Sequence, residues 1–321
     1  MLLTQIRNKL RKSLPKAWLI SLRDWRDRLL DVPGYFRERR KFGSNSIALD
    51  VLETLRSFFW PVRTILFYPQ RPLPLHRAAE TKLCALLGYA MTANPSRHFD
   101  AAFKRRGLTL FDPEILKFVP VSMDLIINAR SVDVSKTAVA RAVAEVFGYP
   151  LEVDPTEYHG RIVEKSDKNG AHDGRVLQGP IAPDRIRPGV VYQKEIDNTV
   201  GDGSDVVDHR VVIYGDEIPC IFLKYRPLDI RFMNKSPRVA LALAEDVFSP
   251  DETEKLIRVA RALGIDFGEF DVLRDKDKRI YVVDANHKPV SPPSHISDAD
   301  GRLAFARMSK SFARLIEKWT I

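Results

Sequence analysis

Hydrophobic and polar positions follow two periods along this chain, and they predict strands and helices in succession. Residues 62–68 are rich in apolar, β-branched and aromatic side chains and end at Pro69, which is typical of a buried strand. Apolar residues at helical spacing follow at 75–87, and residues 124–128 have the composition of another strand. Because strands alternate with helices here, we expect a small α/β domain with a largely parallel sheet.

The middle and the end of the chain have the patterns of hairpins and helices. A helix is expected at 135–147, because Ser135 is a good N-cap and Gly148 ends the apolar pattern. Gly215 and Asp216 separate two β-rich runs and predict a hairpin turn. The predicted strands are 160–165, 175–177, 190–193, 207–214 and 218–225, and further helices are expected at 251–263 and 301–319.

The most informative stretch is 270–286, where two β-rich runs flank the charged residues 275–278. If those four residues form the turn, strand alternation places Asp271, Asp284 and Asn286 on one face, with the two aspartates as diagonal neighbours. Oxygen ligands on one sheet face suit Mg²⁺, which keeps several waters and also binds substrate phosphates. A solvated sheet edge with its polar residues outward is the alternative.

A lysine and a glycine-containing loop precede this hairpin. Lys165 ends a predicted strand, and the loop after it contains Asn169, Gly170 and Gly174. Glycines let a backbone approach phosphate oxygens, and a lysine neutralises their charge. An ordinary hairpin is the alternative explanation of this loop.

Further cations lie on the predicted hairpin around Gly215. Arg210 follows Asp208 by two residues on the first strand, and Lys224 and Arg226 lie on the returning strand. The planar fork of an arginine matches phosphate oxygens, and neighbouring cations stabilise their negative charge. A single cation is more often a solvated surface side chain without a binding role. It is therefore the order of these cations along the chain that indicates a phosphate site.

The order of these segments resembles the ATP-grasp superfamily over about residues 130–290. A lysine strand with a glycine loop is followed by an Asp-x-Arg strand and then by an acid–acid–Asn set. The resemblance implies an α/β and α+β fold, with a small N-terminal α/β domain followed by two α+β lobes that enclose the nucleotide. Asp284 stands where the family more often has Glu, and its shorter side chain has less reach.

The resemblance also assigns roles to residues. Arg210 would face the transferred phosphoryl group as a catalytic residue, with Lys224 and Arg226 extending the positive surface. The inter-lobe hinge would bind adenine through its backbone and ribose through Glu195 or Asp197, although an ordinary strand end fits equally well. The implied metal ligands are Asp271, Asp284 and Asn286, and the implied nucleotide-binding residues are Lys136, Lys165, Asn169, Gly170, Gly174, Gln193, Lys194, Glu195, Ile196 and Asp197.

The implied activity is ATP-dependent ligation of a carboxylate to an amine through an acyl-phosphate. ATP and Mg²⁺ are the implied cofactors, with Mn²⁺ as an alternative ion, and the substrates would be small molecules, peptides or sugars that carry a carboxylate or an amine. Two other functions stay open, because fold alone does not fix function. One is a kinase that phosphorylates a small-molecule or sugar hydroxyl, and the other is a nucleotide-binding module recruited by a basic arm.

That basic arm holds almost all of the net charge. Residues 1–41 contain 12 Lys and Arg and 4 acids, so 12 − 4 = +8 of the total charge of +9 lies there. Leu and Trp residues recur in the arm at helical spacing, so it is expected to contact an anionic membrane surface, a protein partner or the body of the chain. Nucleic acid is an unlikely partner, since no nucleic-acid-binding motif is present.

Other features of the composition indicate a cytoplasmic protein, with at most peripheral contact with the inner membrane face. The 2 cysteines lack metal-ligand spacing, and the sequence has neither a signal-peptide pattern nor an apolar run long enough to span a membrane. The expected organisation is a basic amphipathic arm (1–60), a small α/β domain (61–132), a first lobe (133–195), and a second lobe with the metal site and the last helix (196–321).

Overall fold

The computed structural model describes most of the chain from residue 61 onward, and only isolated residues before it. The described residues are 48, 51–52, 54–56, 61–69, 78–171, 173–233 and 236–321. The basic segment 1–41, and with it the predicted membrane or partner contact, lies outside the described residues. Within the described part of the chain, no helix has both the length and the apolar character needed to cross a bilayer.

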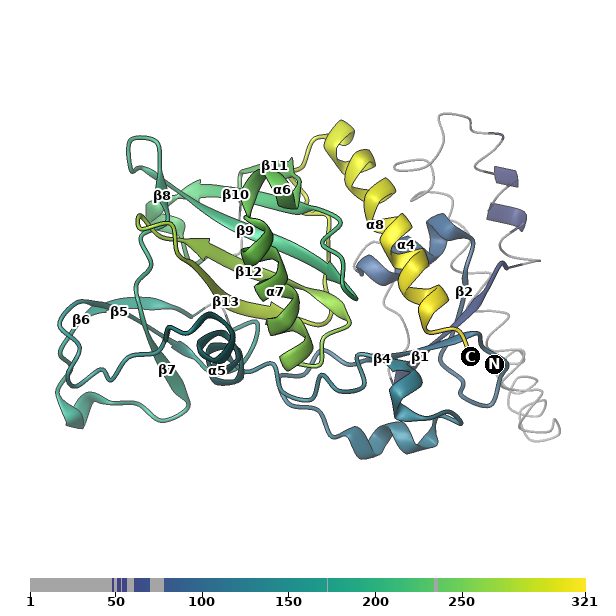
Figure 1. Cartoon of the computed structure of the whole chain (residues 1–321), viewed down its shortest axis with the longest axis horizontal. Coiled ribbons are helices and arrows are strands. Elements are labelled where there is room, and N and C mark those ends of the chain that lie inside the picture. Colours follow the sequence, from purple (N-terminus) through teal and green to yellow (C-terminus); the bar gives the residue numbers. More distant parts are fainter. Residues whose placement is uncertain are drawn as a thin grey trace, which may run out of the picture.

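The first sheet has four parallel strands in the order β2-β1-β3-β4, as the alternation of strands and helices predicted. Its central strand is β1 (Thr64–Pro69), and α4 (Ala79–Leu87) follows it in sequence and contacts the long C-terminal helix (Figure 1). The other strands of the sheet are β2 (Ala90–Thr92), β3 (Ala101–Arg105) and β4 (Ile126–Ile127).

Two features of this sheet differ from expectation. The predicted strand at 124–128 is only two residues long, because Met123–Leu125 form a 3₁₀ turn in front of it. No strand was expected at β3, since Lys104 and Arg105 make its sequence polar, yet both side chains are buried. The Nζ of Lys104 donates to the carbonyl of Ser131 at 2.6 Å, and Arg105 donates to the carboxylate of Glu80 at 2.5 Å, which satisfies these charged groups inside the protein.

The second sheet has six antiparallel strands and forms the centre of the molecule (Figure 1). Its main path runs β11-β10-β9-β12-β13, and β8 pairs with β9 beside this path. Both predicted hairpins, β9–β10 and β12–β13, are confirmed. The strands are β8 (Thr199–Val200), β9 (Asp205–Tyr214), β10 (Ile221–Pro227), β11 (Arg238–Ala242), β12 (Phe267–Arg274) and β13 (Ile280–Asn286).

The third sheet has three antiparallel strands in the order β6-β5-β7. It consists of β5 (Arg161–Ser166), β6 (Arg175–Gln178) and β7 (Val190–Lys194), which confirms the three strands predicted in this region. Short helical turns connect the larger elements. They are α6 (Ala244–Val247) and the 3₁₀ turns Pro113–Phe118, Met123–Leu125, Pro183–Arg185 and Leu228–Ile230.

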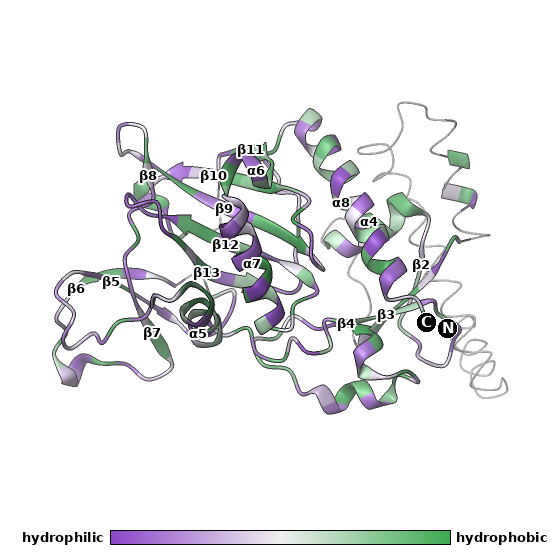
Figure 2. Cartoon of the chain, in the orientation of Figure 1, coloured by the Kyte–Doolittle hydropathy of each residue, from purple (hydrophilic) through white to green (hydrophobic). Residues whose placement is uncertain are grey.

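Helices cover both faces of the six-stranded sheet. On one face, α5 (Lys136–Phe147) and α7 (Pro250–Ala262) pack against an aliphatic core of the sheet. On the other face, α8 (Asp298–Lys318) buries Phe312 against the stacked rings of Tyr214 and Phe267. In Figure 2 α8 alternates between hydrophobic and hydrophilic stretches, as expected for a helix with one buried face.

The helix ends follow local sequence signals. The hydroxyl of Ser135 accepts a hydrogen bond from the backbone of Ala138, which confirms the predicted N-cap of α5. Ser249 and Glu252 form a capping box at the start of α7, and Gly148 ends α5 in a left-handed conformation with φ 79°. These helices therefore begin and end where the sequence alone specifies.

Asn128 joins the parallel sheet to the central sheet. Its side-chain oxygen accepts hydrogen bonds from the backbone of Asp266 at 2.8 Å and of Phe267 at 2.9 Å, and its amide donates to the carbonyl of Phe267 at 2.8 Å. The residue is fully buried and has a left-handed φ of 63°, which Asn tolerates better than most residues. One side chain thus fixes the end of β4 beside the start of β12.

We expect Asn128→Ala to lower the free energy of unfolding by about 2–5 kcal/mol, because two buried N–H groups lose their acceptor and Ala is strained at this φ. Urea unfolding followed by circular dichroism measures the change. Asn128→Gly removes the same hydrogen bonds but tolerates the left-handed φ, so it is expected to lose less stability than Asn128→Ala. A loss below about 1 kcal/mol for Asn128→Ala would show that this junction contributes little beyond an average hydrogen bond.

Candidate active site

Part of one face of the central sheet is charged rather than apolar. Side chains along each strand alternate between the two faces of the sheet. One face has the aliphatic core beneath α5 and α7, and the half of the other face that α8 covers is aromatic. The other half of that face has side chains with ionic or amide groups on four neighbouring strands. These are Asp208 and Arg210 of β9, Lys224 and Arg226 of β10, Glu269 and Asp271 of β12, and Asp284 and Asn286 of β13.

The two candidate metal carboxylates lie directly opposite each other. Asp271 pairs with Asp284, and the register shifts between Asp271 and Val272, which is a β-bulge. The expected diagonal relation is therefore wrong, although the shared face is as predicted. The expected four-residue turn is also wrong, because the backbone of Asp275 bonds to the carbonyl of Arg279 and leaves a three-residue loop. Direct opposition brings the carboxylates closer together than a diagonal placement would.

Arg210 lies between two acids at the centre of this face. Its Nε and Nη2 donate to the two carboxylate oxygens of Asp271 at 3.0 and 2.9 Å, and its Nε lies 3.8 Å from Glu269. The Nζ of Lys224 is 3.7 Å from Asp271 on the other side. Burial raises the pKa of Asp271, but Arg210 and Lys224 outweigh it, and the net shift of this pKa is downward. Asp271 is therefore held as a carboxylate.

The environment of Asp284 differs from that of Asp271, because one of its carboxylate oxygens accepts no hydrogen bond from a described residue. Its Oδ1 is buried and has no hydrogen-bond partner among the described residues, while the Nζ of Lys136 lies 3.9 Å away. Burial raises the pKa of Asp284, and Lys136 opposes this shift only in part. The side chain as a whole is still 29% exposed. The carboxylate is therefore partly open to solvent, where a cation can reach it.

The residues present fit a magnesium ion, although they do not form a complete cage. No group of three or more His, Cys, Asp or Glu side chains in the described chain is arranged to hold a metal ion. Both oxygens of Asp271 are engaged by Arg210, and the side-chain oxygen of Asn286 accepts from the backbone of Lys288 at 2.9 Å. Mg²⁺ commonly uses only one or two carboxylates and completes its shell with phosphates and water. Asp284, with its unsatisfied oxygen, is the best-placed ligand.

The predicted phosphate loop lies along the strand that contains Asp284. The Nζ of Lys165 donates to the carbonyl of Val283 at 3.1 Å, and the side chain of Asn169 donates to the carbonyl of Ala285 at 2.8 Å. The Nζ of Lys136 donates to a carbonyl of the same loop at 2.8 Å. The structure therefore brings these three predicted residues together with β13.

Glycine is favoured at positions 170 and 174 for two different structural reasons. Gly170 has a φ of 75°, which favours glycine, and a Cβ there would meet nothing within 4 Å. At Gly174 a Cβ would lie 2.8 Å from the ring of Phe232, so this position needs glycine to pack. Gly170 thus serves the backbone conformation and Gly174 the packing against Phe232, and neither observation by itself requires a nucleotide.

Positive charge gathers around Asp284 from three directions. Lys136 comes from the start of α5, Lys165 from the end of β5, and Arg210 from the middle of β9. Burial lowers the pKa of Lys165 to about 8, and Asp284 opposes this shift. Burial likewise lowers the pKa of Lys224. Such a group of partly desolvated cations is arranged to receive an anion.

Arg226 is placed differently from the other two predicted catalytic residues. Its Nη2 donates to the carboxylate of Asp208 at 2.6 Å, and its Nη1 donates to the carbonyls of Arg231 and Met233 at 2.9 and 3.0 Å. The guanidinium thus anchors the segment after β10. We interpret Arg226 as a positioning residue and keep Arg210 and Lys224 as the candidates for contact with a reacting group.

The predicted hinge residues lie at the end of β7, and most of their side chains are engaged in the protein. Glu195 forms ion pairs with Arg161 and Arg231, and the Nζ of Lys194 donates to the hydroxyl of Tyr281 at 2.8 Å. Asp197 is 59% exposed, and its carboxylate accepts hydrogen bonds from the backbone N–H and the hydroxyl of Thr199. Of the two proposed ribose ligands, Asp197 is the more accessible. Gln193 is buried, and the carbonyl of Ile196 accepts from Arg231.

Glu269 is the residue of this face that the sequence analysis missed. Its side chain is 1% exposed, and burial raises its pKa, with Arg210 opposing the shift. The signal was present, because Glu269 precedes Asp271 by two residues and strand alternation puts both on one face. It lies opposite Asn286 in the register, next to the pair formed by Asp271 and Asp284.

Comparison with known proteins gives distant structural likenesses. No protein-family model matches the sequence, and no curated protein sequence matches it. Similar solved structures include the ATP-grasp ligase PsnB in complex with a phosphomimetic variant of minimal precursor, Mg and ADP, at 16% identity and a TM-score of 0.41, covering 62% of this chain and 66% of that chain. A RimK domain protein ATP-grasp from Sphaerobacter thermophilus is 15% identical at a TM-score of 0.44, covering 77% and 98%.

A third similar structure is the VanG D-Ala:D-Ser ligase from Enterococcus faecalis, 12% identical at a TM-score of 0.47, covering 68% of this chain and 74% of that one. PsnB and the RimK domain protein are named as ATP-grasp proteins, the superfamily that the sequence motifs resemble. The likeness to PsnB spans just under two thirds of that chain. Activity and substrate are therefore inferred from the residues of this protein.

Arg210 contacts two acids, Asp271 and Glu269, which predicts that variants of Arg210 and of Lys224 differ in stability. We expect Arg210→Ala to lower the free energy of unfolding by about 3–5 kcal/mol, because Asp271 loses two hydrogen bonds and the buried Glu269 loses the cation that lies 3.8 Å from it. Lys224→Met is the control, since Asp271 then keeps Arg210, and a loss of about 1 kcal/mol is expected. Adding Glu269→Gln to Arg210→Ala is expected to restore part of the stability. Equal losses in the two single variants, measured by urea unfolding, would contradict this account of Glu269.

Proposed function

We propose that the protein is an Mg²⁺-dependent, ATP-grasp-type ligase that joins a carboxylate to an amine through an acyl-phosphate. The main support is the position of Asp284, whose unsatisfied oxygen lies among Lys136, Lys165 and the pair of Arg210 with Asp271. An orphaned carboxylate oxygen surrounded by cations suits a metal ion bound together with phosphate groups. The resemblance of the motif order to ATP-grasp enzymes supports the same reading.

The cations retain donors for a phosphate chain. Lys136 and Lys165 each use one donor for a backbone carbonyl, and an ammonium group has three. Arg210 uses its Nε and Nη2 for Asp271, and its Nη1 forms no hydrogen bond with a described residue. These groups would bind and orient the phosphates of ATP, and Arg210 would stabilise the oxygens of the transferred group. Mg²⁺, when bound through Asp284, would neutralise phosphate charge.

The proposed reaction has two steps. A substrate carboxylate oxygen attacks the γ-phosphorus of ATP, the bond to the β-phosphate oxygen breaks, and ADP leaves. The amine nitrogen then attacks the acyl carbon, phosphate leaves with the bonding electron pair, and the amine proton passes to solvent. Arg210 and Lys224 would stabilise the negative charge that develops in both steps, as preorganised cations do.

We expect Asp284→Asn to reduce Mg²⁺-dependent ADP release by at least about tenfold, which corresponds to about 1.4 kcal/mol in transition-state stabilisation. The substitution should not lower stability, because the raised pKa of Asp284 shows that the folded state disfavours its charge. Asp277→Asn, on the exposed turn of the same hairpin, is the matched control. ADP release is measured by a coupled assay with pools of carboxylates, amines and sugars.

The same assay separates the proposed ligase from a kinase. Hydroxylamine added during turnover traps an acyl-phosphate as a hydroxamate, so a hydroxamate is expected with the active carboxylate pool. ADP release with a phosphorylated hydroxyl and no hydroxamate would replace the ligase proposal by a kinase. Full activity in Asp284→Asn would remove this residue from the metal site.

The pKa of Lys165 gives a pH dependence with a defined sign. Only the protonated amine neutralises phosphate, and this pKa is about 8, so affinity for a non-hydrolysable ATP analogue should fall as pH rises through that value. From about pH 7 to about pH 9 we expect roughly tenfold weaker binding by calorimetry. Lys165→Arg stays charged over this range, so its binding should change much less. The same slope in both proteins would exclude Lys165 from the phosphate site.

A further inference from the structure

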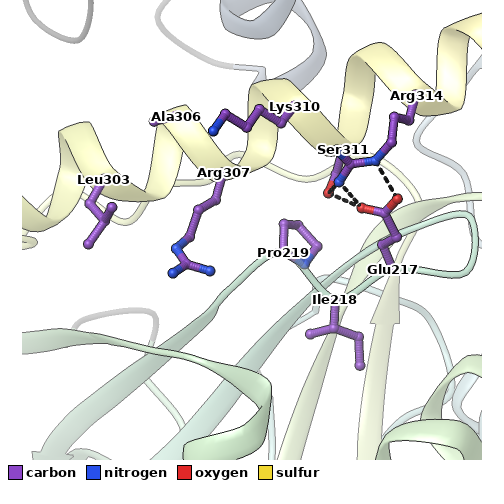
Figure 3. A pocket seen from close by; sticks show the side chains of 9 residues that line it. All are labelled: Glu217, Ile218, Pro219, Leu303, Ala306, Arg307, Lys310, Ser311 and Arg314. Atoms are coloured by element: carbon purple, nitrogen blue, oxygen red, sulfur yellow. Dashed lines mark hydrogen bonds and ion pairs between the residues drawn. The ribbon is translucent and has the colours of Figure 1, made fainter.

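A groove lies between α8 and the turn that joins β9 to β10 (Figure 3). Its volume is about 580 Å³, and none of the residues proposed above to bind nucleotide or metal lines it. Ile218 and Pro219 form the wall on the turn, while Leu303, Arg307 and Lys310 belong to the helix wall. The catalytic proposal leaves this groove without a role.

The two walls are fixed relative to each other. The carboxylate of Glu217 accepts hydrogen bonds from Nε and Nη2 of Arg314 at 2.6 and 2.5 Å and from the hydroxyl of Ser311 at 2.5 Å. On its other side the turn is held by Asp216, which pairs with Arg261 of α7 at 2.8 Å. The groove is thus preformed, which reduces the ordering cost of binding.

The groove has an excess of positive charge. Glu217 neutralises Arg314, whereas no ion pair joins Arg307 or Lys310 to a carboxylate among the described residues. In Figure 3 the side chain of Arg307 extends from α8 into the space beside Pro219. An arginine at the side of a preformed groove, with no ion pair to the described residues, can pair with a carboxylate from outside.

The helix wall is also apolar at one end and arranged as a stripe. Leu303 is 49% exposed, across the groove from Ile218 and Pro219. Leu303, Arg307 and Lys310 are spaced by four and three residues, so they share one side of the helix. From Leu303 to Arg314 this stripe is about 16 Å long at 1.5 Å per residue, roughly the length of five residues of extended peptide.

We propose that this groove docks an acidic peptide segment of a partner protein. An apolar side chain of the peptide would sit between Leu303 and Ile218, and its carboxylates would pair with Arg307 and Lys310. The chain's own residues 1–41 have the wrong sign for this role, since their net charge is +8. A nucleic acid or a membrane surface would need many cations on an open face, whereas this groove has an apolar wall and three cations, of which Glu217 neutralises one. The inference does not depend on the proposed catalytic function.

The test uses the full-length protein and a fluorescent six-residue peptide that contains one leucine followed by three glutamates. Fluorescence anisotropy is expected to show saturable binding that weakens with added salt. Arg307→Ala combined with Lys310→Ala should weaken binding at least tenfold, and Leu303→Ser should weaken it several-fold. Arg258→Ala combined with Arg302→Ala removes the same charge from exposed positions outside the groove and should change affinity less than twofold.

Four outcomes would overturn the proposal. One is no saturable binding up to about 1 mM peptide. The second is equal binding of a control peptide with glutamines in place of glutamates. The third is binding of inorganic triphosphate, but not of the peptide, that depends on Arg307 and Lys310, which would assign the groove to a small anion. The last is self-association in sedimentation velocity that the double variant abolishes, which would assign the groove to a second copy of the chain.

Discussion

The pairing of Arg210 with Asp271 is the interaction on which the charged half of the central sheet depends. Four strands place acids and cations together on a face that is otherwise apolar, and ions in such a place must be paired to be tolerated. Arg210 meets this requirement for Asp271 through two hydrogen bonds and for Glu269 through a longer contact. On this face Asp284 and Glu269 both keep buried oxygens without a hydrogen-bond partner among the described residues, and of the two only Asp284 is partly exposed to solvent.

This arrangement divides one sheet into an aromatic, packed half and an ionic half that forms the proposed active site. Tyr214 and Phe267 stack at the end covered by α8, and Asn128 fixes the start of β12 at that end. Farther along the same strands, the face turns from aromatic to ionic. The apolar end thus holds the strands in a register that brings Arg210, Asp271 and Asp284 together. A rigid scaffold that positions a preorganised charged site is what phosphoryl transfer requires.

Much of the local structure could be predicted because its causes are local. Strand alternation indicated that Asp271, Asp284 and Asn286 share a face, and Ser135 and Gly148 marked the ends of α5. Prediction failed where the cause lay elsewhere in the chain. β3 ends in Lys104 and Arg105, which look exposed in sequence, but the Ser131 carbonyl and Glu80 satisfy them in the interior. The short strand β11 was also not predicted, because it is defined by its pairing with β10 in the folded sheet.

The sequence by itself determined which residues could form helices, hairpins and a candidate phosphate site, because helical periodicity, capping and strand alternation act over a few neighbouring residues. The tertiary structure decided which charges meet. It placed Arg210 against Asp271 across 61 residues of sequence, put Asp284 directly opposite Asp271 through a β-bulge, and turned Arg226 toward Asp208. Strand register and the neutralisation of buried charges depend on partners distant in sequence. Short-range patterns contain no information about which distant residues will meet.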